Sequence, residues 1–202
     1  MIDSHVIRAV AFDAYGTLVE ITDKRRPYER VARARTINPL VSPITQELDL
    51  IAFADRCGLV LNAQWQSDLA AELKSIRPFE EGRDVLTALH RAGYRVAVAS
   101  NLALPYETPI RACYGDLLDV ACLSFEIGAA KPDAPFYRAL CRQLDCEPQE
   151  ILMVGDSWRS DYQGATRAGL QALHLDRRGV GPAGREAITI TDLRRLLAIL
   201  PA

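Results

Sequence analysis

The chain has 202 residues, of which 49% are hydrophobic and 25% are charged, so the composition excludes an intrinsically disordered protein. This length allows one domain of ordinary size with room for a small insertion. The net charge of −2 offers no field that would attract nucleic acid or an anionic membrane surface, and we expect neither as a partner.

The N-terminus, MIDSHVIRAV, has neither the basic region nor the long apolar stretch of a signal peptide. No apolar run reaches the length of a transmembrane helix, and we therefore expect a cytoplasmic protein. The five cysteines are odd in number and contain no Cys-x-x-Cys pair, so we expect free thiols instead of disulfides or zinc ligands. A monomer and a homodimer are both compatible with these features.

Short apolar runs rich in β-branched residues recur along the chain, and they are too short for core helices but suit buried strands. The predicted strands are residues 6–12, 94–99, 120–123, 151–154 and 170–175. Amphipathic patterns predict helices over residues 81–91, 106–114, 135–144, 160–168 and 192–200. Strands and helices that alternate in this way predict a doubly wound α/β domain with a parallel sheet covered on both faces.

One segment interrupts this alternation. Between Val19 and Phe79 we find no convincing buried strand, but three helical patterns separated by proline and glycine breaks. These patterns cover residues 28–35, 44–57 and 63–76. We therefore expect a Rossmann-like α/β core made of residues 1–18 and 79–202, with residues 19–78 forming a small all-helical cap.

Polar side chains follow the predicted strands at their carboxyl ends, where open parallel sheets bind ligands. Each of them alone could cap a turn or lie in solvent. Together they supply a nucleophile, hydroxyl and amide donors, a cation and a pair of acids, which is a complete active site. These residues are Asp13, Ser100, Asn101, Lys131, Asp156 and Asp161.

The stretches FDAYGTL, SN, KP and VGDSWRSD, in this order, resemble the four motifs of the haloacid dehalogenase-like (HAD) hydrolases. The resemblance extends over nearly the whole chain, with the cap inserted after the first motif. It implies that Asp13 is the nucleophile and forms a covalent aspartyl intermediate. Ser100 and Asn101 would hold the oxygens of the transferred group, and Lys131 would neutralise negative charge.

Tyr15 separates two chemistries. Phosphatases of this family usually carry a second aspartate two residues after the nucleophile, where it protonates the leaving alcohol. Here the residue is Tyr15, and the string DAYGT resembles the branch that hydrolyses 2-haloacids, in which a halide leaves without a proton. A tyrosine with its ordinary pKa near 10 is a poor proton donor at neutral pH, so a phosphatase would need a substrate with a good leaving group or an acid supplied by the cap.

The fourth motif favours the phosphatase. Two carboxylates about 4 Å apart repel each other by about 4 kcal/mol at an effective dielectric constant near 20. Asp13, Asp156 and Asp161 gathered around one lysine would therefore be poorly balanced without a divalent cation, and oxygen ligands suit Mg²⁺. We expect Asp13, Asp156 and the backbone carbonyl of Tyr15 to bind Mg²⁺, with Asp161 orienting these ligands. Trp158 either lines the substrate pocket or packs against the core.

The leading hypothesis is a Mg²⁺-dependent phosphatase that acts on a small, anionic, phosphorylated metabolite through an aspartyl-phosphate intermediate. The close alternative is a metal-free 2-haloacid dehalogenase, indicated by the string DAYGT with Tyr15 and by Trp158 after the acid motif, where dehalogenases also carry a tryptophan. A remote alternative is a binding module that has kept the site but lost turnover. The basic residues at the start of the cap form a solvated helix face for the most part, although one of them could reach an anionic substrate.

Overall fold

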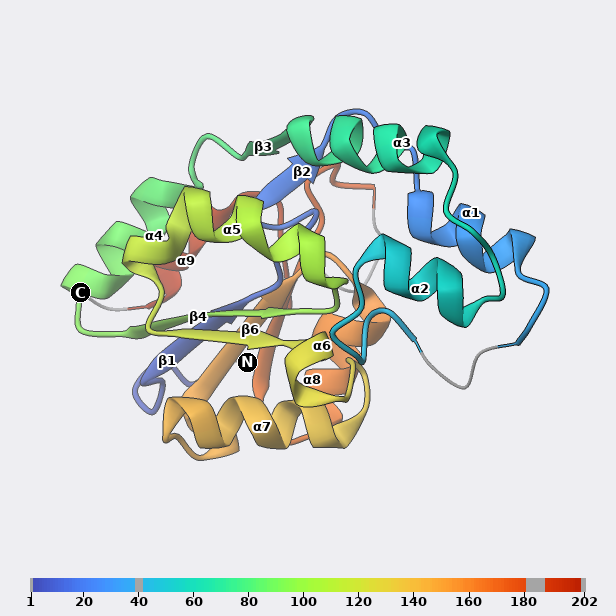
Figure 1. Cartoon of the computed structure of the whole chain (residues 1–202). Coiled ribbons are helices and arrows are strands. Elements are labelled where there is room, and N and C mark those ends of the chain that lie inside the picture. The colour runs from blue at the N-terminus through green and yellow to red at the C-terminus, as the bar shows by residue number, and fades with distance from the viewer. Residues whose placement is uncertain (1, 39–41, 181–187, 201–202) are drawn as a thin grey trace.

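The computed structural model describes residues 2–38, 42–180 and 188–200. Its centre is a six-stranded sheet with the order β5-β4-β1-β6-β7-β8, in which all neighbouring strands are parallel (Figure 1). The strands are β1 (Ala9–Phe12), β4 (Arg95–Ser100), β5 (Val120–Leu123), β6 (Ile151–Gly155), β7 (Gln171–Leu175) and β8 (Thr189–Ile190). The predicted doubly wound α/β fold is confirmed, although the two-residue β8 was too short to be predicted.

Helices cover both faces of this sheet (Figure 1). One face carries α4 (Gly82–Arg91), α5 (Glu107–Tyr114) and α9 (Leu196–Ile199). The other carries α6 (Ser124–Ile127), α7 (Ala134–Leu144) and α8 (Ala165–Arg167). Single-turn helical segments connect these elements: η1 (Leu104–Tyr106), η2 (Gly115–Leu117), η3 (Pro148–Glu150) and η6 (Leu193–Arg195).

Side chains of the central strand β1 alternate between the two faces of the sheet, and those on both faces are buried. Val10 and Phe12 pack into the core on the α4 side, and Ala9 and Ala11 face α7. The small alanines leave room there for large side chains such as Phe136, which is fully buried. Each face of the sheet is therefore filled by its own hydrophobic cluster, and β1 is held rigidly at the centre of the molecule.

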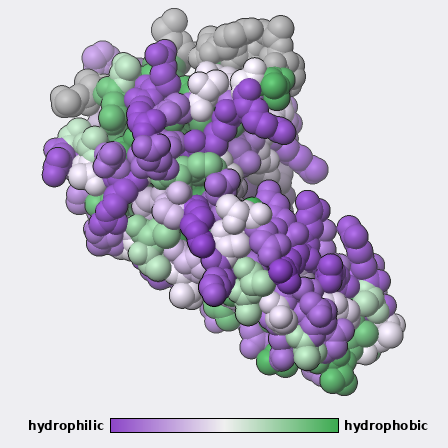
Figure 2. Space-filling view, turned by 90° about the horizontal axis from the view of Figure 1, so that it is seen from above, coloured by the Kyte–Doolittle hydropathy of each residue, from purple (hydrophilic) through white to green (hydrophobic). Residues whose placement is uncertain are grey.

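Residues 19–78, which we call the insertion, lie between β1 and α4. They contain α1 (Pro27–Ala34), α2 (Leu50–Arg56) and α3 (Ala63–Lys74), and they have a hydrophobic cluster that includes Val31, Leu50 and Phe53. In the view of Figure 2 the molecule has a broad body and a narrower lobe, and hydrophilic residues cover most of this face. The insertion extends to the side of the sheet at the right of Figure 1.

The prediction that the insertion is all-helical was wrong for its first and last residues, where it joins the core. Strands β2 (Val19–Ile21) and β3 (Ile76–Pro78) pair antiparallel there, with Ile21 opposite Ile76. Three-residue strands are too short to show a two-residue period, and their pairing joins segments far apart in the sequence. The predicted helix over residues 44–57 begins only at Leu50, because the side chain of Asp49 accepts a hydrogen bond from the Ala52 amide and caps it there.

Two further details differ from the prediction. The helix expected over residues 160–168 is a π-helix, η4 (Trp158–Gly164), followed by α8. The closing helix expected over residues 192–200 is divided into η6 and α9. The five cysteines are free thiols, as expected. None of the helices in the described part of the chain has the length and hydrophobicity that a membrane crossing requires.

Candidate active site

The carboxyl ends of β4, β1 and β6 form the rim where the predicted site residues meet. Strand β1 lies between the other two, with Phe12 paired to Val98 and Val154. Asp13 continues the pairing, because its amide donates to the carbonyl of Val154 at 2.9 Å. The rigid centre of the sheet therefore presents the carboxylate of Asp13, a residue that is 8% exposed, at a fixed position.

Lys131 connects the acids at this rim. Its Nζ atom donates to Asp13 Oδ1 at 2.8 Å, to Asp161 Oδ1 at 2.6 Å and to the carbonyl of Ala99 at 2.6 Å. These bonds use all three protons of the ammonium group, whose side chain is 1% exposed. Burial alone would lower the pKa of Lys131, but the charges of Asp13 and Asp161 raise it above its ordinary value. The lysine therefore stays protonated.

Ser100 is the last residue of β4 and Asn101 follows it, and the two side chains form hydrogen bonds with different residues. The hydroxyl of Ser100 donates to Asp13 Oδ1 at 3.1 Å. The amide of Asn101 donates to the carbonyl of Lys131 at 2.7 Å and accepts from its backbone N–H at 2.8 Å. Asn101, expected to hold substrate oxygens, thus also fixes the loop that carries Lys131.

Asp13, Asp156 and Asp161 come together as an acidic cluster, with one carboxylate oxygen from each lying within 4.8 Å of the others. The backbone amide of Ser157 donates to Asp161 Oδ2 at 2.8 Å, and Lys131 occupies Asp161 Oδ1. Asp156 lies at the exposed edge of the cluster, whereas Asp13 and Asp161 are buried. Asp156 is therefore the acid that is most available to a ligand.

The electrostatics of the cluster are unfavourable without a cation. Burial raises the pKa of Asp13 to about 6, against the lowering effect of Lys131 and with a further increase from Asp161. The pKa of Asp156 is also raised, first by the desolvation of its inner side and then by the charge of Asp161. Three carboxylates share one ammonium group, so a divalent cation fits the donor set.

Tyr15 directs its hydroxyl away from Asp13, the predicted nucleophile. Its hydroxyl donates to the carbonyl of Tyr106 at 2.7 Å, and the two rings meet edge to face at 5.8 Å. Burial, with smaller contributions from nearby groups such as Cys113 and Glu72, raises the pKa of Tyr15 above its ordinary value. Both observations make the phenol a poor source of a proton for a leaving group.

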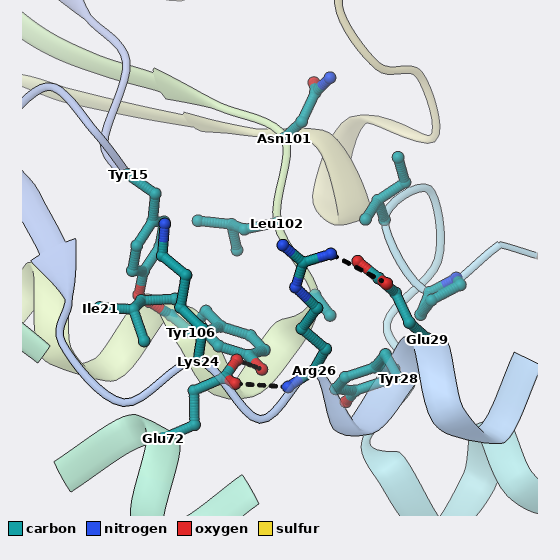
Figure 3. Close-up of a pocket in the computed structure, with 13 residues that line it drawn as sticks. Tyr15, Ile21, Lys24, Arg26, Tyr28, Glu29, Glu72, Asn101, Leu102 and Tyr106 are labelled. Carbon is teal, nitrogen blue, oxygen red and sulfur yellow. Dashed lines mark hydrogen bonds and ion pairs between the residues drawn. The ribbon is translucent and has the colours of Figure 1, made fainter. Parts of the chain in front are cut away.

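A cavity of about 380 Å³ lies between this rim and the insertion (Figure 3). Tyr15 and Asn101 line the end next to the rim, and apolar residues such as Ile21, Ile44 and Leu102 line much of the rest. Charged and aromatic residues of the insertion and of η1 also line it. These are Lys24, Arg26, Tyr28, Glu29, Glu72 and Tyr106. The cavity therefore adjoins the rim at Tyr15 and Asn101, and its wall carries two cationic and two anionic side chains.

Glu72 organises the wall of this cavity, and the sequence analysis did not identify it. The residue is 4% exposed and accepts from the hydroxyl of Tyr106 at 2.6 Å, from the amide of Arg26 at 2.6 Å and from the amide of Arg25. Arg26 has φ of 56°, which is unusual for a residue other than glycine. The buried carboxylate holds this turn, and in Figure 3 the Arg26 side chain extends into the cavity.

Trp158 was a candidate for the substrate pocket. Its ring stacks on Tyr162 with centroids 4.4 Å apart and meets the edge of His174 at 5.5 Å. It is not among the residues that line the cavity between rim and insertion. The alternative account of Trp158, packing against neighbouring elements, describes these contacts.

Arg177 is a second residue that the sequence analysis did not identify. It follows β7, and its guanidinium donates to the carbonyls of Gly16 and Thr17 within the first motif. The same rule that selected Asp13, a polar residue just beyond a predicted strand, could have found it.

Comparisons with known proteins bear on the family of this chain. A family model described as haloacid dehalogenase-like hydrolase matches residues 7–169. The glyceraldehyde 3-phosphate phosphatase of Methanothermobacter thermautotrophicus is 25% identical over an alignment 230 residues long with its gaps, which covers 96% of this chain and 100% of that protein. The (S)-2-haloacid dehalogenase 4A of Burkholderia cepacia is 26% identical over 228 residues, which cover 98% and 97% respectively.

Among solved structures, a HAD phosphatase from Thermococcus onnurineus is similar with a TM-score of 0.72 and 21% identity, covering 96% of this chain and 97% of that one. This likeness shows the shared fold. The curated relatives include both phosphatases and a dehalogenase, and both are hydrolases. With the family match over most of its length, the acid-rich rim and the fold, the chain belongs to the haloacid dehalogenase-like hydrolases.

Proposed function

We propose that the protein is a Mg²⁺-dependent phosphatase that acts on a small phosphorylated metabolite through an aspartyl-phosphate intermediate. The observation that carries this proposal is the position of Asp156, whose carboxylate lies within 4.8 Å of Asp13 and Asp161 around a single lysine. A doubly charged cation would balance the negative charge of these three carboxylates.

The donor set suits Mg²⁺, which prefers oxygen ligands. Asp13, Asp156 and the carbonyl of Tyr15 would hold the ion, and Asp161 would orient them, since both of its oxygens already accept hydrogen bonds. When bound, Mg²⁺ supplies positive charge that offsets the charge of the phosphate oxygens.

The residues of the chain carry the covalent steps. Asp13 attacks phosphorus, the bond to the leaving oxygen breaks, and an aspartyl phosphate remains. Lys131 and Ser100 both donate hydrogen bonds to Asp13 Oδ1. Their bonds leave Oδ2 as the oxygen that would attack phosphorus. Water then attacks phosphorus, which releases inorganic phosphate and restores the Asp13 carboxylate.

The substrate would occupy the cavity of about 380 Å³ next to Asn101 and Tyr15. The volume suits a small metabolite. Arg26 on the wall is paired with Glu29, so Lys24 is the cationic side chain that would contact an anionic group of the substrate. The insertion would act as a cap that excludes bulk water from the reacting atoms and selects the substrate. The relative from Methanothermobacter thermautotrophicus is a glyceraldehyde 3-phosphate phosphatase, and a substrate of that size would fit the cavity.

Tyr15 supports a second candidate, a 2-haloacid dehalogenase. A halide leaves without a proton, so a tyrosine whose hydroxyl is bonded to Tyr106 is no disadvantage in that reaction. The dehalogenase relative from Burkholderia cepacia covers nearly the whole chain. In this reaction Asp13 would attack carbon and displace halide, forming an ester that water then hydrolyses.

A substrate panel separates the two reactions. Phosphate release from phosphomonoesters and halide release from 2-haloalkanoates are measured with Mg²⁺ and with a chelator. We expect phosphate release that chelator abolishes and that Asp156→Asn reduces strongly. Asp13→Asn is the control for contaminating activity. Phosphate release that persists in chelator contradicts the proposal, and chelator-insensitive halide release supports the dehalogenase instead.

A further inference from the structure

Arg177 connects two segments that are far apart in the sequence. It lies two residues beyond β7, and its side chain is 21% exposed. A guanidinium group is planar, always charged and able to donate hydrogen bonds in several fixed directions. Here three of its nitrogens donate to three different residues, and its face covers an aromatic ring.

The first segment leads from the nucleophile into the insertion. Arg177 Nη2 donates to the carbonyl of Thr17 at 2.6 Å, and Nε donates to the carbonyl of Gly16 at 3.3 Å. These carbonyls lie between Asp13 and β2. The arginine thus holds the backbone where the chain leaves the core.

The second segment leads from the insertion back to the core. Arg177 Nη1 donates to Glu81 Oε1 at 2.6 Å, and its Cζ atom lies 3.6 Å from the centre of the Phe79 ring. Glu81 is 4% exposed and precedes α4. The two segments also contact each other directly, because the amide of Phe79 donates to the carbonyl of Leu18 at 3.0 Å.

The first segment also sets the spacing of the acidic cluster. Gly16 has φ of 94°, and a Cβ atom at this position would overlap the carboxylate of Asp156. The backbone around Gly16 is therefore packed directly against Asp156. A shift of this segment would move the Tyr15 carbonyl relative to the carboxylates of Asp13 and Asp156.

We propose that Arg177 is a positioning residue that holds both crossings between the core and the insertion, and so fixes the loop after Asp13 against Asp156. Its effect on catalysis rests on the proposed function, whereas its effect on the two crossings does not. A lysine cannot replace it fully, since one ammonium group cannot reach Thr17, Gly16 and Glu81 in the directions of the guanidinium fork.

Hydrogen exchange of the full-length protein tests the structural part without any substrate. In Arg177→Gln we expect the backbone amides of residues 16–22 and of residues 76–82 to exchange together, at least about 10-fold faster than in the wild type. Arg177→Lys should be intermediate, and Arg178→Gln, a change at the exposed neighbour, should match the wild type. Unchanged exchange, or acceleration in only one of the two segments, would overturn the proposal.

Kinetics test the catalytic part. With a substrate that the wild type hydrolyses, we expect Arg177→Gln to lower kcat by about 10- to 100-fold, because small displacements of catalytic groups have effects of this size. KM should change by less than about threefold, and the Mg²⁺ concentration for half-maximal rate should rise. Arg177→Lys should recover part of kcat. A loss confined to KM, or equal rates in all variants, contradicts positioning by Arg177.

Two further results must be distinguished from a failure of the role of Arg177: absence of activity in the wild type, and failure of Arg177→Gln to fold. If the wild type hydrolyses neither phosphomonoesters nor 2-haloalkanoates, the proposed function fails, while the exchange experiment still decides whether Arg177 holds the crossings. If Arg177→Gln does not fold because Glu81 is left as a buried unpaired charge, the double variant Arg177→Gln/Glu81→Gln removes both charges. Faster exchange in both segments of that variant supports the proposal, and wild-type exchange contradicts it.

Discussion

Asp13 is buried and is the proposed nucleophile, so its protonation would decide the pH range of activity. Burial raises its pKa to about 6, which Lys131 opposes and Asp161 increases. A carboxyl group attacks only when it is ionised, so a raised pKa removes activity on the acidic side. Below about pH 6 the metal-free protein therefore holds Asp13 mainly in its protonated form.

This pKa leads to a prediction that separates the two reactions. We expect kcat/KM to fall about tenfold per pH unit below pH 6 at limiting Mg²⁺, and the acidic limb to move to lower pH as Mg²⁺ is raised, because a nearby cation favours the ionised carboxylate. The measurement is a series of pH–rate profiles at increasing Mg²⁺. An acidic limb that stays at the same pH at every Mg²⁺ concentration would favour the metal-free dehalogenase.

Tyr15 predicts which leaving groups the enzyme tolerates. Its hydroxyl is bonded to the carbonyl of Tyr106, so phosphate esters with acidic leaving groups should react much faster than alkyl esters. In Tyr15→Asp we expect alkyl phosphate turnover to rise by at least about 10-fold, because a positioned general acid contributes about 10²–10⁴-fold. The check is the dependence of rate on leaving-group pKa.

The matched control is Tyr15→Phe, which keeps the ring against Tyr106 and removes only the hydroxyl. Its dependence on the leaving group should be the same as in the wild type. If Tyr15→Phe selectively loses alkyl phosphate turnover, the phenol is the proton donor and the geometric argument is wrong.

At the scale of elements, the turn from β1 to β2 must pass close to the end of β6. Gly16 makes this possible, because its φ of 94° is accessible to glycine and a side chain would overlap Asp156. We expect Gly16→Ala to lower the free energy of unfolding by about 1–3 kcal/mol and to abolish most activity. Thermal or denaturant unfolding and steady-state kinetics measure the two effects.

Gly93 supplies the control for backbone strain alone. Its φ is 88°, but a Cβ atom there would meet nothing within 4 Å. Gly93→Ala should lose a similar amount of stability from the unfavourable φ and keep its activity once folded. Equal activity in both variants would show that the contact between Gly16 and Asp156 has no catalytic importance.

Glu72 joins three elements, and its removal should be costly. It lies on α3 and accepts from the backbone of Arg25 and Arg26 before α1 and from Tyr106 in η1. We expect Glu72→Ala to lower the free energy of unfolding by about 2–4 kcal/mol, since buried donors lose their acceptor. Denaturant unfolding measures this, with the exposed Glu80→Ala as a control of nearly zero effect; similar values for both would contradict the role of Glu72.

At the scale of the whole molecule, the insertion and the core each have their own hydrophobic clusters. Ile21 and Ile76 face each other in the β2–β3 pair, so the chain could return there by a short hairpin. We predict that replacing residues 22–75 by Asn-Gly yields a core that folds cooperatively, because this dipeptide suits a two-residue hairpin.

Kinetics of that shortened protein test the selection of substrate. It should still hydrolyse a small activated phosphoester slowly, but discriminate less among metabolites, because the wall that carries Lys24 and Arg26 is removed. Circular dichroism and thermal unfolding check the fold. A shortened chain that does not fold would show that the insertion and the core form one folding unit.

Much of this protein follows from local sequence patterns. Apolar runs of four to six residues determine the central strands, and their alternation with helices determines the parallel order, since crossovers have a preferred hand. Asp13, Ser100 and Asp156 could be predicted as neighbours for the same reason: each follows a strand, and parallel strands end at one rim.

Only the tertiary structure decided the contacts that depend on distant segments. The pairing of β2 with β3, the bond from Tyr15 to Tyr106 and the contacts of Arg177 each join residues whose proximity leaves no periodic signal in the sequence. Sequence places a side chain on a strand or after it, but its direction is set by the atoms packed around it. For this reason the sequence determined which groups meet at the rim, and the packing decided that Tyr15 points away from them.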